Sequence, residues 1–237
     1  MPIPDESPGS EPIARNYSRV RDEVEAAARA SGRAPESVRI VGVTKTVDAA
    51  AAAALYRAGC RDLGENRPEE LVRKAADPGL AGVVWHLIGT YQRRKVRDTL
   101  AAPDWIHSID SIPLLSAIAA RAETLGRVGA KAPRLLLQIN VSGEESKGGF
   151  SPAELPVALA AAESAGLRPV GLMTMAPLDP ACGSPGDVFR ALRLLRDRFA
   201  SDDLPLTELS MGMSGDFVEA IREGATIVRI GTALFRS

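Results

Sequence analysis

Apolar runs and amphipathic runs alternate along this chain about eight times. Strands are predicted at 38–43, 62–66, 83–89, 105–110, 134–140 and 169–175, mostly from near-continuous apolar or β-branched runs typical of strands buried on both faces. Two shorter runs, at 209–216 and 226–232, begin as strands and end in small residues. Apolar residues at helical spacing predict helices at 13–30, 47–58, 68–76, 92–101, 112–125, 152–165, 187–199 and 217–222.

This alternation, with short connections, predicts an α/β fold in which a single parallel (β/α)8 barrel closes on itself. A doubly wound sheet is the alternative, but about eight repeats in 237 residues favour closure. Almost nothing follows the eighth strand, so an outer helix is missing there and the N-terminal helix 13–30 is expected to fill the gap. Residues 1–10 are predicted to form a mobile N-terminal tail, and residues 11–237 to form the barrel domain.

Composition narrows the class of protein. Hydrophobic residues make up 45% of the chain, which suffices for a sizeable core, and the net charge of −1 gives no sign of nucleic-acid binding. The acidic, Pro-rich N-terminus lacks the features of a signal peptide, and no apolar run is long enough to span a membrane. Cys60 and Cys182 lack metal-ligand spacing, and no metal site is predicted. We therefore expect a cytoplasmic protein with reduced thiols.

The two last strands end in residues suited to binding a phosphate. Ser214 and Gly215 lead into the helix 217–222, and Gly231 and Thr232 follow the eighth strand. Unpaired backbone N–H groups at such turns favour an anion, and barrels often bind phosphate with the loops after strands 7 and 8. Two ordinary strand ends with small turn residues are an equally weighted alternative at this point.

Lys45 follows the first apolar strand, at the end of the barrel where catalytic groups gather. A lysine in a partly desolvated pocket attacks carbonyls as a free amine, although a salt-bridged surface lysine is the commoner case. Combined with a phosphate-binding turn, the amine suggests an aldehyde that carries a phosphate. Pyridoxal 5′-phosphate (PLP) is one candidate, and a sugar phosphate bound by a Schiff-base aldolase is the other.

Arg229 bears on this choice because it precedes the Gly231–Thr232 turn and could reach a ring nitrogen. A guanidinium, with a pKa above about 12, donates a hydrogen bond to an unprotonated pyridine nitrogen and cannot protonate it. The cofactor is then a poor electron sink, which disfavours demanding carbanion chemistry. A structural ion pair of Arg229 with Glu219 or Glu223 is about as plausible from the sequence.

The motifs taken together resemble the PLP homeostasis (PLP-binding) protein family, a single-domain relative of the N-terminal barrel of alanine racemase. The resemblance runs from about residue 38 to 235 and is carried by Val43-Thr44-Lys45, Gly64-Glu65-Asn66, Trp85-His86-Leu87-Ile88-Gly89, His107-Ser108-Ile109-Asp110, Gln138-Ile139-Asn140, Ser146-Lys147-Gly148-Gly149, Gly171-Leu172-Met173-Thr174-Met175, Ser210-Met211-Gly212-Met213-Ser214 and Val228-Arg229-Ile230-Gly231-Thr232. It implies that Lys45 carries the Schiff base with PLP. It also implies that Asn66 and Met175 line the ring, that Arg229 faces the ring nitrogen, and that Ser214, Gly231 and Thr232 hold the phosphate.

The chain departs from the family pattern at Arg67, at 93–95 and at Arg236. None of these positions is expected to touch the Schiff base or the phosphate, so the departures concern the pocket rim and any partner surface. His86 and His107 are interpreted as hydrogen-bonding residues of the barrel interior rather than as catalytic bases. The polar loop around Lys147 is predicted to be a rim or lid, with Lys147 an auxiliary contact for the ligand.

Three functions remain open at this point. The resemblance favours a PLP carrier that buffers the cofactor inside the cell, hands it to apo-enzymes and turns over no amino acid. A PLP-dependent racemase needs a second base, and Tyr17, Tyr56 and Tyr91 do not lie at predicted strand ends. A sugar-phosphate aldolase is the third possibility. The lack of a racemase partner domain suggests a monomer.

Overall fold

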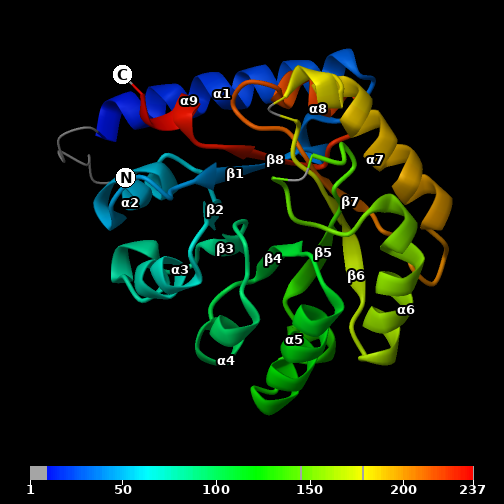
Figure 1. The fold of residues 1–237 in the computed structure, drawn as a ribbon. Helices are drawn as coiled ribbons and strands as arrows, with labels where there is room; N and C mark the ends of the chain where they lie inside the picture. Colours follow the sequence, from blue (N-terminus) through cyan, green and yellow to red (C-terminus); the bar gives the residue numbers. More distant parts are fainter. Residues whose placement is uncertain (1–9, 145, 178, 237) are drawn as a thin grey trace.

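Eight parallel strands form one closed barrel in the computed structural model, which describes residues 10–144, 146–177 and 179–236 (Figure 1). The strands follow the chain order around the barrel: β1 (Arg39–Val43), β2 (Asp62–Glu65), β3 (Val84–Leu87), β4 (Trp105–Ile109), β5 (Arg134–Gln138), β6 (Pro169–Met173), β7 (Glu208–Ser210) and β8 (Ile227–Ile230). Because β8 pairs with β1, the barrel is closed. The predicted (β/α)8 barrel is confirmed, and the doubly wound sheet is wrong.

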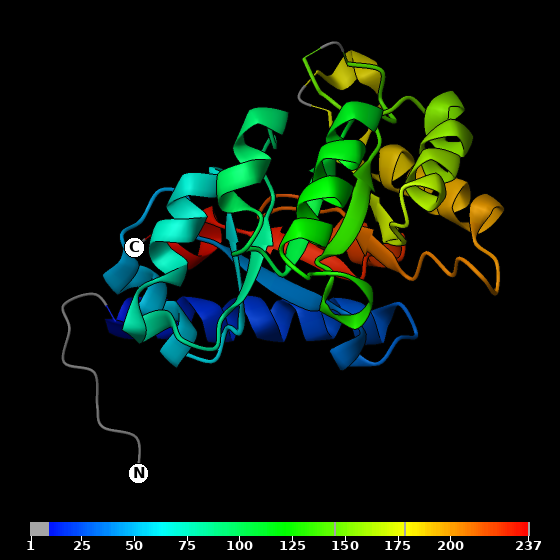
Figure 2. The ribbon, with the colours of Figure 1, turned by 90° about the horizontal axis from the view of Figure 1, so that it is seen from below.

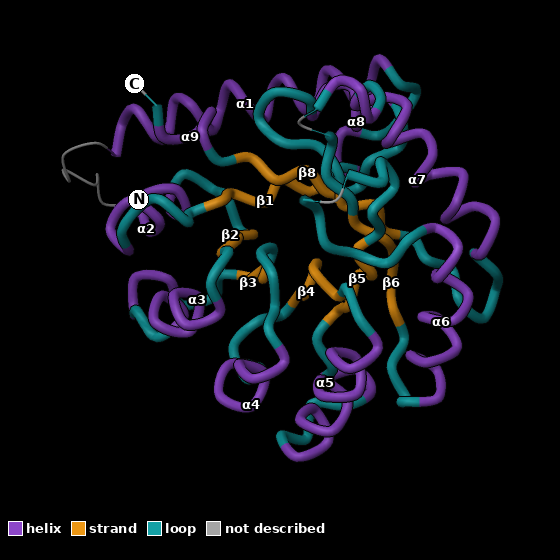
Figure 3. Tube along the Cα trace, viewed as in Figure 1, coloured by secondary structure: helices purple, strands orange, loops and turns teal. Residues whose placement is uncertain are grey.

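Helices surround the strands on the outside (Figure 3). They are α1 (Ser10–Ala30), α2 (Ala49–Arg57), α3 (Pro68–Ala75), α4 (Val96–Thr99), α5 (Ile112–Thr124), α6 (Leu155–Ser164), α7 (Pro185–Phe199), α8 (Phe217–Arg222) and α9 (Thr232–Phe235). The predicted helix 92–101 is shorter, with a 3-10 turn at Arg93–Lys95 before α4. Several predicted strands are longer than the observed ones, because their last residues already belong to the loops at the C-terminal end of the barrel.

The gap after β8 is filled by α1, as the sequence predicted. Helix α9 has four residues, and α1 packs beside it and against α2 and α8 (Figure 2). The side-chain amide of Asn16 donates to the carbonyls of Leu234 at 3.2 Å and Arg236 at 3.0 Å. The first helix therefore holds the end of the chain against the barrel. Helix α1 begins at Ser10, and the rest of the predicted tail lies outside the described residues.

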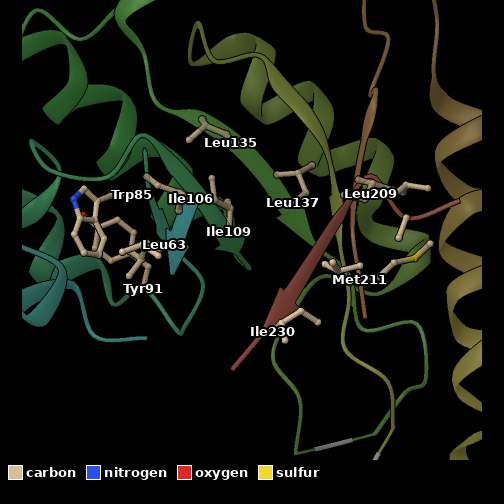
Figure 4. Packing of buried hydrophobic residues seen from close by; sticks show 14 of the residues in the cluster. Leu63, Trp85, Tyr91, Ile106, Ile109, Leu135, Leu137, Leu209, Met211 and Ile230 are labelled. Carbon is tan, nitrogen blue, oxygen red and sulfur yellow. The ribbon is translucent and has the colours of Figure 1, made fainter. Parts of the chain in front are cut away.

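Side chains of each strand alternate between the barrel interior and the surrounding helices. A small cluster, Val41, Trp105, Leu136, Met173 and Ile227, lies inside the barrel. The larger cluster lies between strands and helices and includes Leu63, Trp85, Ile106, Leu137 and Leu209 (Figure 4). The interior is a packed core that supports the loops at its C-terminal end.

Two further observations concern membranes and metal ions. Within the described residues, no helix has the length and apolar character needed to cross a membrane. In the same part of the chain, no group of three or more His, Cys, Asp or Glu side chains is arranged to hold a metal ion. Cys60 and Cys182 are free thiols, and Cys60 is buried.

Candidate functional site

A cavity of about 570 Å³ lies at the C-terminal end of the barrel strands. Its walls come from the loops after β1, β2, β3, β5, β6, β7 and β8 and from the last residues of some strands, such as Gln138 of β5. Two other hollows lie at the N-terminal end of the barrel and contain no predicted site residue. The C-terminal cavity is lined by all seven residues that the sequence singled out: Lys45, Asn66, Met175, Ser214, Arg229, Gly231 and Thr232.

Lys45 reaches the cavity from the turn between β1 and α2. The preceding residue, Thr44, is buried, and its N–H donates to the carbonyl of Gly64 at 2.9 Å. Lys45 itself is exposed. Lys45 thus lies at the surface end of the cavity, and its reaction with a carbonyl group stays a prediction.

A buried ion pair fixes the turn that carries Lys45. The Lys74 ammonium contacts the Glu65 carboxylate at 2.5 Å, with both side chains only 2% exposed. Lys74 also donates to the carbonyls of Thr44 (2.8 Å) and Val47 (2.9 Å), and the Thr44 hydroxyl donates to Glu65 at 2.7 Å. The pair thus ties α3 and β2 to the residues on both sides of Lys45. Sequence reasoning missed Lys74; the signal was a lysine three residues after Leu71, on the buried face of α3.

Arg229 lies on the floor of the cavity and is almost fully buried. Its guanidinium donates to the hydroxyl of Ser210 at 2.6 Å and to the carbonyl of Thr174 at 2.9 Å. Burial lowers the pKa of Arg229 to about 10, so the side chain keeps its charge at neutral pH. The alternative ion pair is wrong: Glu223 pairs with Arg190 and Arg193, and no described carboxylate pairs with Arg229.

The turns after β7 and β8 lie side by side. The Ser214 hydroxyl accepts hydrogen bonds from the backbone N–H groups of Gly231 (3.3 Å) and Ala233 (3.4 Å). Among the described residues, the N–H groups of Ser214, Gly215 and Thr232 have no acceptor. Three unpaired donors at the edge of one cavity favour an anion. The two turns form one continuous part of the cavity wall, and their binding of a phosphate stays a prediction.

Asn66 and Met175 flank the middle of the cavity. Asn66 is half-buried and comes directly after β2, and Met175 packs against the interior cluster from the loop after β6. Gly89 brings β3 close to Asn66, because a Cβ at Gly89 would lie 2.3 Å from the Asn66 carbonyl oxygen. A contact of these two side chains with a ligand ring stays a prediction.

Lys147 closes one side of the cavity from the loop after β5. Its ammonium bonds to the carbonyl of Ala176 and lies 3.3 Å from the Glu144 carboxylate. The side-chain amide of Gln138 donates to the backbone carbonyl of the neighbouring Gly148 at 2.7 Å. The predicted position at the rim is confirmed for the described part of this loop, which omits residue 145. A ligand contact by Lys147 stays a prediction.

His86 and His107 are fully buried in the barrel interior, and neither lines the cavity. Nδ1 of His86 lies 2.9 Å from Nε2 of His107. Burial lowers the pKa of both histidines, and for His107 the charges of His86 and Arg229 lower it further. The neighbouring Asp62 carboxylate raises the pKa of His86 and so opposes part of this lowering. The interpretation as interior hydrogen-bonding residues rather than bases is confirmed.

Acid should destabilise the fold through these two histidines. In the unfolded chain they titrate near pH 6.5, whereas in the folded chain their lowered pKa keeps them neutral below that pH. The unfolded chain then binds more protons, so their contribution is intact above pH 6.5 and is lost as the pH falls. We expect a loss of about 2 kcal/mol at pH 5 for each histidine that stays neutral there. Urea unfolding from pH 7.5 to 5 measures it, and an unchanged midpoint over this range would contradict it.

Comparisons with known proteins agree with this geometry. The family described as "Alanine racemase, N-terminal domain" matches residues 14–237. The pyridoxal phosphate homeostasis protein of Pseudomonas aeruginosa is 40% identical over 224 residues, which cover 94% of each chain. That of Escherichia coli K12 is 38% identical over 231 residues, with 94% of this chain and 95% of the relative covered. The chain belongs to the pyridoxal phosphate homeostasis protein family.

Solved structures of this family share the barrel. PipY of Synechococcus elongatus, solved with PLP bound, is 35% identical, superposes with a TM-score of 0.79, and is covered completely by 94% of this chain. Alanine racemase of Bartonella henselae, 19% identical with a TM-score of 0.70, shows the same fold, and this chain covers 58% of it.

The departures from the family pattern lie outside the cavity lining, as the sequence predicted. Arg67 is the exposed residue before α3, and the turn Arg93–Lys95 pairs with α3 through a contact between Lys95 and Glu69. Arg236 follows α9. None of these positions lines the cavity.

Proposed function

We propose that this chain binds pyridoxal 5′-phosphate in the C-terminal cavity as a Schiff base on Lys45, and that it serves in intracellular PLP homeostasis. One observation carries the proposal: a primary amine, a buried guanidinium and two adjacent turns with unpaired N–H groups line the same cavity. An aldehyde, a ring nitrogen and a phosphate are the three functional groups that such a cavity would recognise, and PLP contains all of them.

The residues fit this ligand group by group. Ser214, Gly231 and Thr232 would hold the phosphate, and Asn66 and Met175 would contact the ring. Arg229 would donate to the ring nitrogen without giving up its proton. PLP supplies an aldehyde that forms an imine with the lysine amine and releases water. With an unprotonated ring nitrogen the cofactor is a poor electron sink, which suits storage better than carbanion chemistry.

Binding without turnover also agrees with the placement of the tyrosines. Tyr91 is buried with its hydroxyl 2.9 Å from that of Thr99, while Tyr17 and Tyr56 lie near Gly59 and Arg61. None of the three lines the cavity, so none is placed as the second base of a racemase. We extend the proposal to a cytoplasmic monomer that contacts neither membranes nor nucleic acid and hands PLP to apo-enzymes. Sedimentation as a stable dimer would contradict the monomer.

Mixing purified protein with PLP should produce the visible absorption band of a Schiff base, and Lys45→Ala should lose it. Lys131→Ala is the matched control, because Lys131 is exposed before β5 at the opposite end of the barrel. Borohydride reduction followed by peptide mass spectrometry should then place the pyridoxyl group on Lys45. An equal band in wild type and Lys45→Ala would refute the assignment, and trapping of a sugar phosphate without PLP would favour an aldolase.

A further inference from the structure

A line of buried polar side chains crosses the barrel interior from the cavity to its opposite end. Arg229 donates to the Ser210 hydroxyl, which lies 2.8 Å from Nδ1 of His107. Nε2 of His107 lies 2.9 Å from Nδ1 of His86, and Nε2 of His86 lies 2.9 Å from a carboxylate oxygen of Asp62. Arg39 pairs with the same oxygen at 2.8 Å. The line joins strands β8, β7, β4, β3 and β2 in that order.

The two charged ends dictate where each hydrogen lies. Arg229 can only donate, so the Ser210 oxygen accepts and its own hydrogen is free to point at Nδ1 of His107. A neutral His107 then carries its hydrogen on Nε2 and donates to Nδ1 of His86. A neutral His86 in turn donates from Nε2 to Asp62, which as a carboxylate only accepts. Each hydrogen bond in the line then has one donor and one acceptor, and each donor lies on the Arg229 side of its acceptor.

The reverse arrangement leaves groups unsatisfied. If His107 carried its hydrogen on Nδ1, the Ser210 oxygen would accept from both Arg229 and His107, and the serine hydrogen would lose its acceptor. Water cannot compensate, because His86, His107 and Ser210 are fully buried and Trp105 stacks on His86 with ring centres 5.3 Å apart. An unsatisfied buried donor is costly, so the geometry selects one set of tautomers.

We propose that Asp62, His86, His107 and Ser210 form a one-directional hydrogen-bond relay that positions the Arg229 guanidinium for its ligand. The relay holds one Nη of Arg229, and the carbonyl of Thr174 holds the other, so the orientation of the whole planar group is fixed. Asp62, at the far end of the barrel, is then a positioning residue for the cavity. The expected histidine tautomers do not depend on a bound ligand. The expected effect of the relay on PLP binding rests on the proposed function.

The chain contains only two histidines, so a nitrogen-15 NMR spectrum of ¹⁵N-histidine protein shows only four ring nitrogens. In ligand-free wild type at pH 7, both rings should be neutral with hydrogen on Nε2. Both lowered pKa values point to the same uncharged state. A charged ring, or hydrogen on Nδ1 of His107, would overturn the relay. This measurement needs no cofactor and no variant, so it decides the relay even if PLP does not bind.

Two variants test the link to the ligand. Ser210→Ala removes the acceptor of Arg229, and we expect PLP affinity to fall about ten- to a hundredfold, as for a lost hydrogen bond to a charged group. Asp62→Asn removes the far anion, and we expect an Nδ1–H form of the histidines to appear together with weaker PLP binding. Tyr91→Phe is the control, since it removes a buried hydrogen bond outside the relay.

The outcomes separate the two proposals. Tyr91→Phe should change stability but neither the tautomers nor the affinity for PLP. Unchanged tautomers and unchanged affinity in folded Asp62→Asn would refute the positioning role of the relay. Wild type that shows the expected tautomers but binds no PLP would refute the proposed function and leave the relay standing.

Discussion

Replacing Lys74 with methionine is expected to lower the free energy of unfolding by about 3–5 kcal/mol, the usual cost of breaking a buried ion pair from one side. Among the described residues, the variant leaves only the Thr44 hydroxyl to stabilise the charge of the buried Glu65 carboxylate. The Val47 carbonyl also loses its Lys74 donor, and the Thr44 carbonyl keeps only the backbone N–H of Val47 at 3.1 Å among the described donors. Because these residues bracket Lys45, PLP binding should weaken as well. Chemical denaturation of the ligand-free protein measures the first effect.

The neighbouring residue provides a matched control. Arg73 pairs with Glu70 on the exposed face of the same helix, at 2.8 Å and with its side chain 58% exposed. Arg73→Met should cost less than about 1 kcal/mol, since exposed ion pairs contribute little. The double variant Lys74→Met/Glu65→Leu removes both charges and should recover much of the lost stability. Equal losses for Arg73→Met and Lys74→Met would show that the buried pair has no special role.

Gly212→Ala is expected to cost about 2–4 kcal/mol and to displace the turn that carries Ser214. Gly212 has φ +93, a conformation that disfavours any side chain, and a Cβ there would lie 2.6 Å from that of Ala220 in α8. Its carbonyl accepts from the backbone N–H of Arg229 at 2.9 Å, so a shift would also move the cavity floor. Denaturation of the apo-protein and titration with PLP would report the two effects separately.

Gly215→Ala, three residues further along, is the matched stability control. An added Cβ there meets nothing within 4 Å, and its φ lies outside the left-handed region. We expect the unfolding free energy of Gly215→Ala to stay within about 0.5 kcal/mol of wild type, as for a tolerated surface change. Comparable losses in the two variants would mean that the turn resists any substitution, whatever the conformation of its glycine.

The elements and the composition of the cavity could be predicted because both follow from local patterns. Apolar runs gave the strands, and the position of a polar residue just after a strand was enough to place it at the C-terminal end of a parallel barrel. The sequence therefore predicts Lys45, Asn66 and Ser214 in one place, and the structure brings them together. Strand ends were less exact: the predicted strand 169–175 ends at Met173, because the β-branched Thr174 and the apolar Met175 look like strand residues but belong to the following loop.

Other features depend on distances between residues far apart in the chain, which no periodicity encodes. The pairing of Lys74 with Glu65 and the line from Arg229 to Asp62 arise only when several strands come together. The sequence suggested a buried role for His107 but not its partner 103 residues away, Ser210. The exposure of Lys45 could not be decided from the sequence, because a strand pattern says nothing about the width of the opening above it.

The pairing of β8 with β1 has a consequence for synthesis of the protein. Lys45 leaves the ribosome long before Arg229, yet both belong to one pocket. A nascent or truncated chain that lacks the last strand has the reactive amine but neither the guanidinium nor the second turn. Capture of the ligand with full affinity would therefore begin only when the barrel is complete, and partial chains would not sequester the vitamin-derived aldehyde while they are still being made.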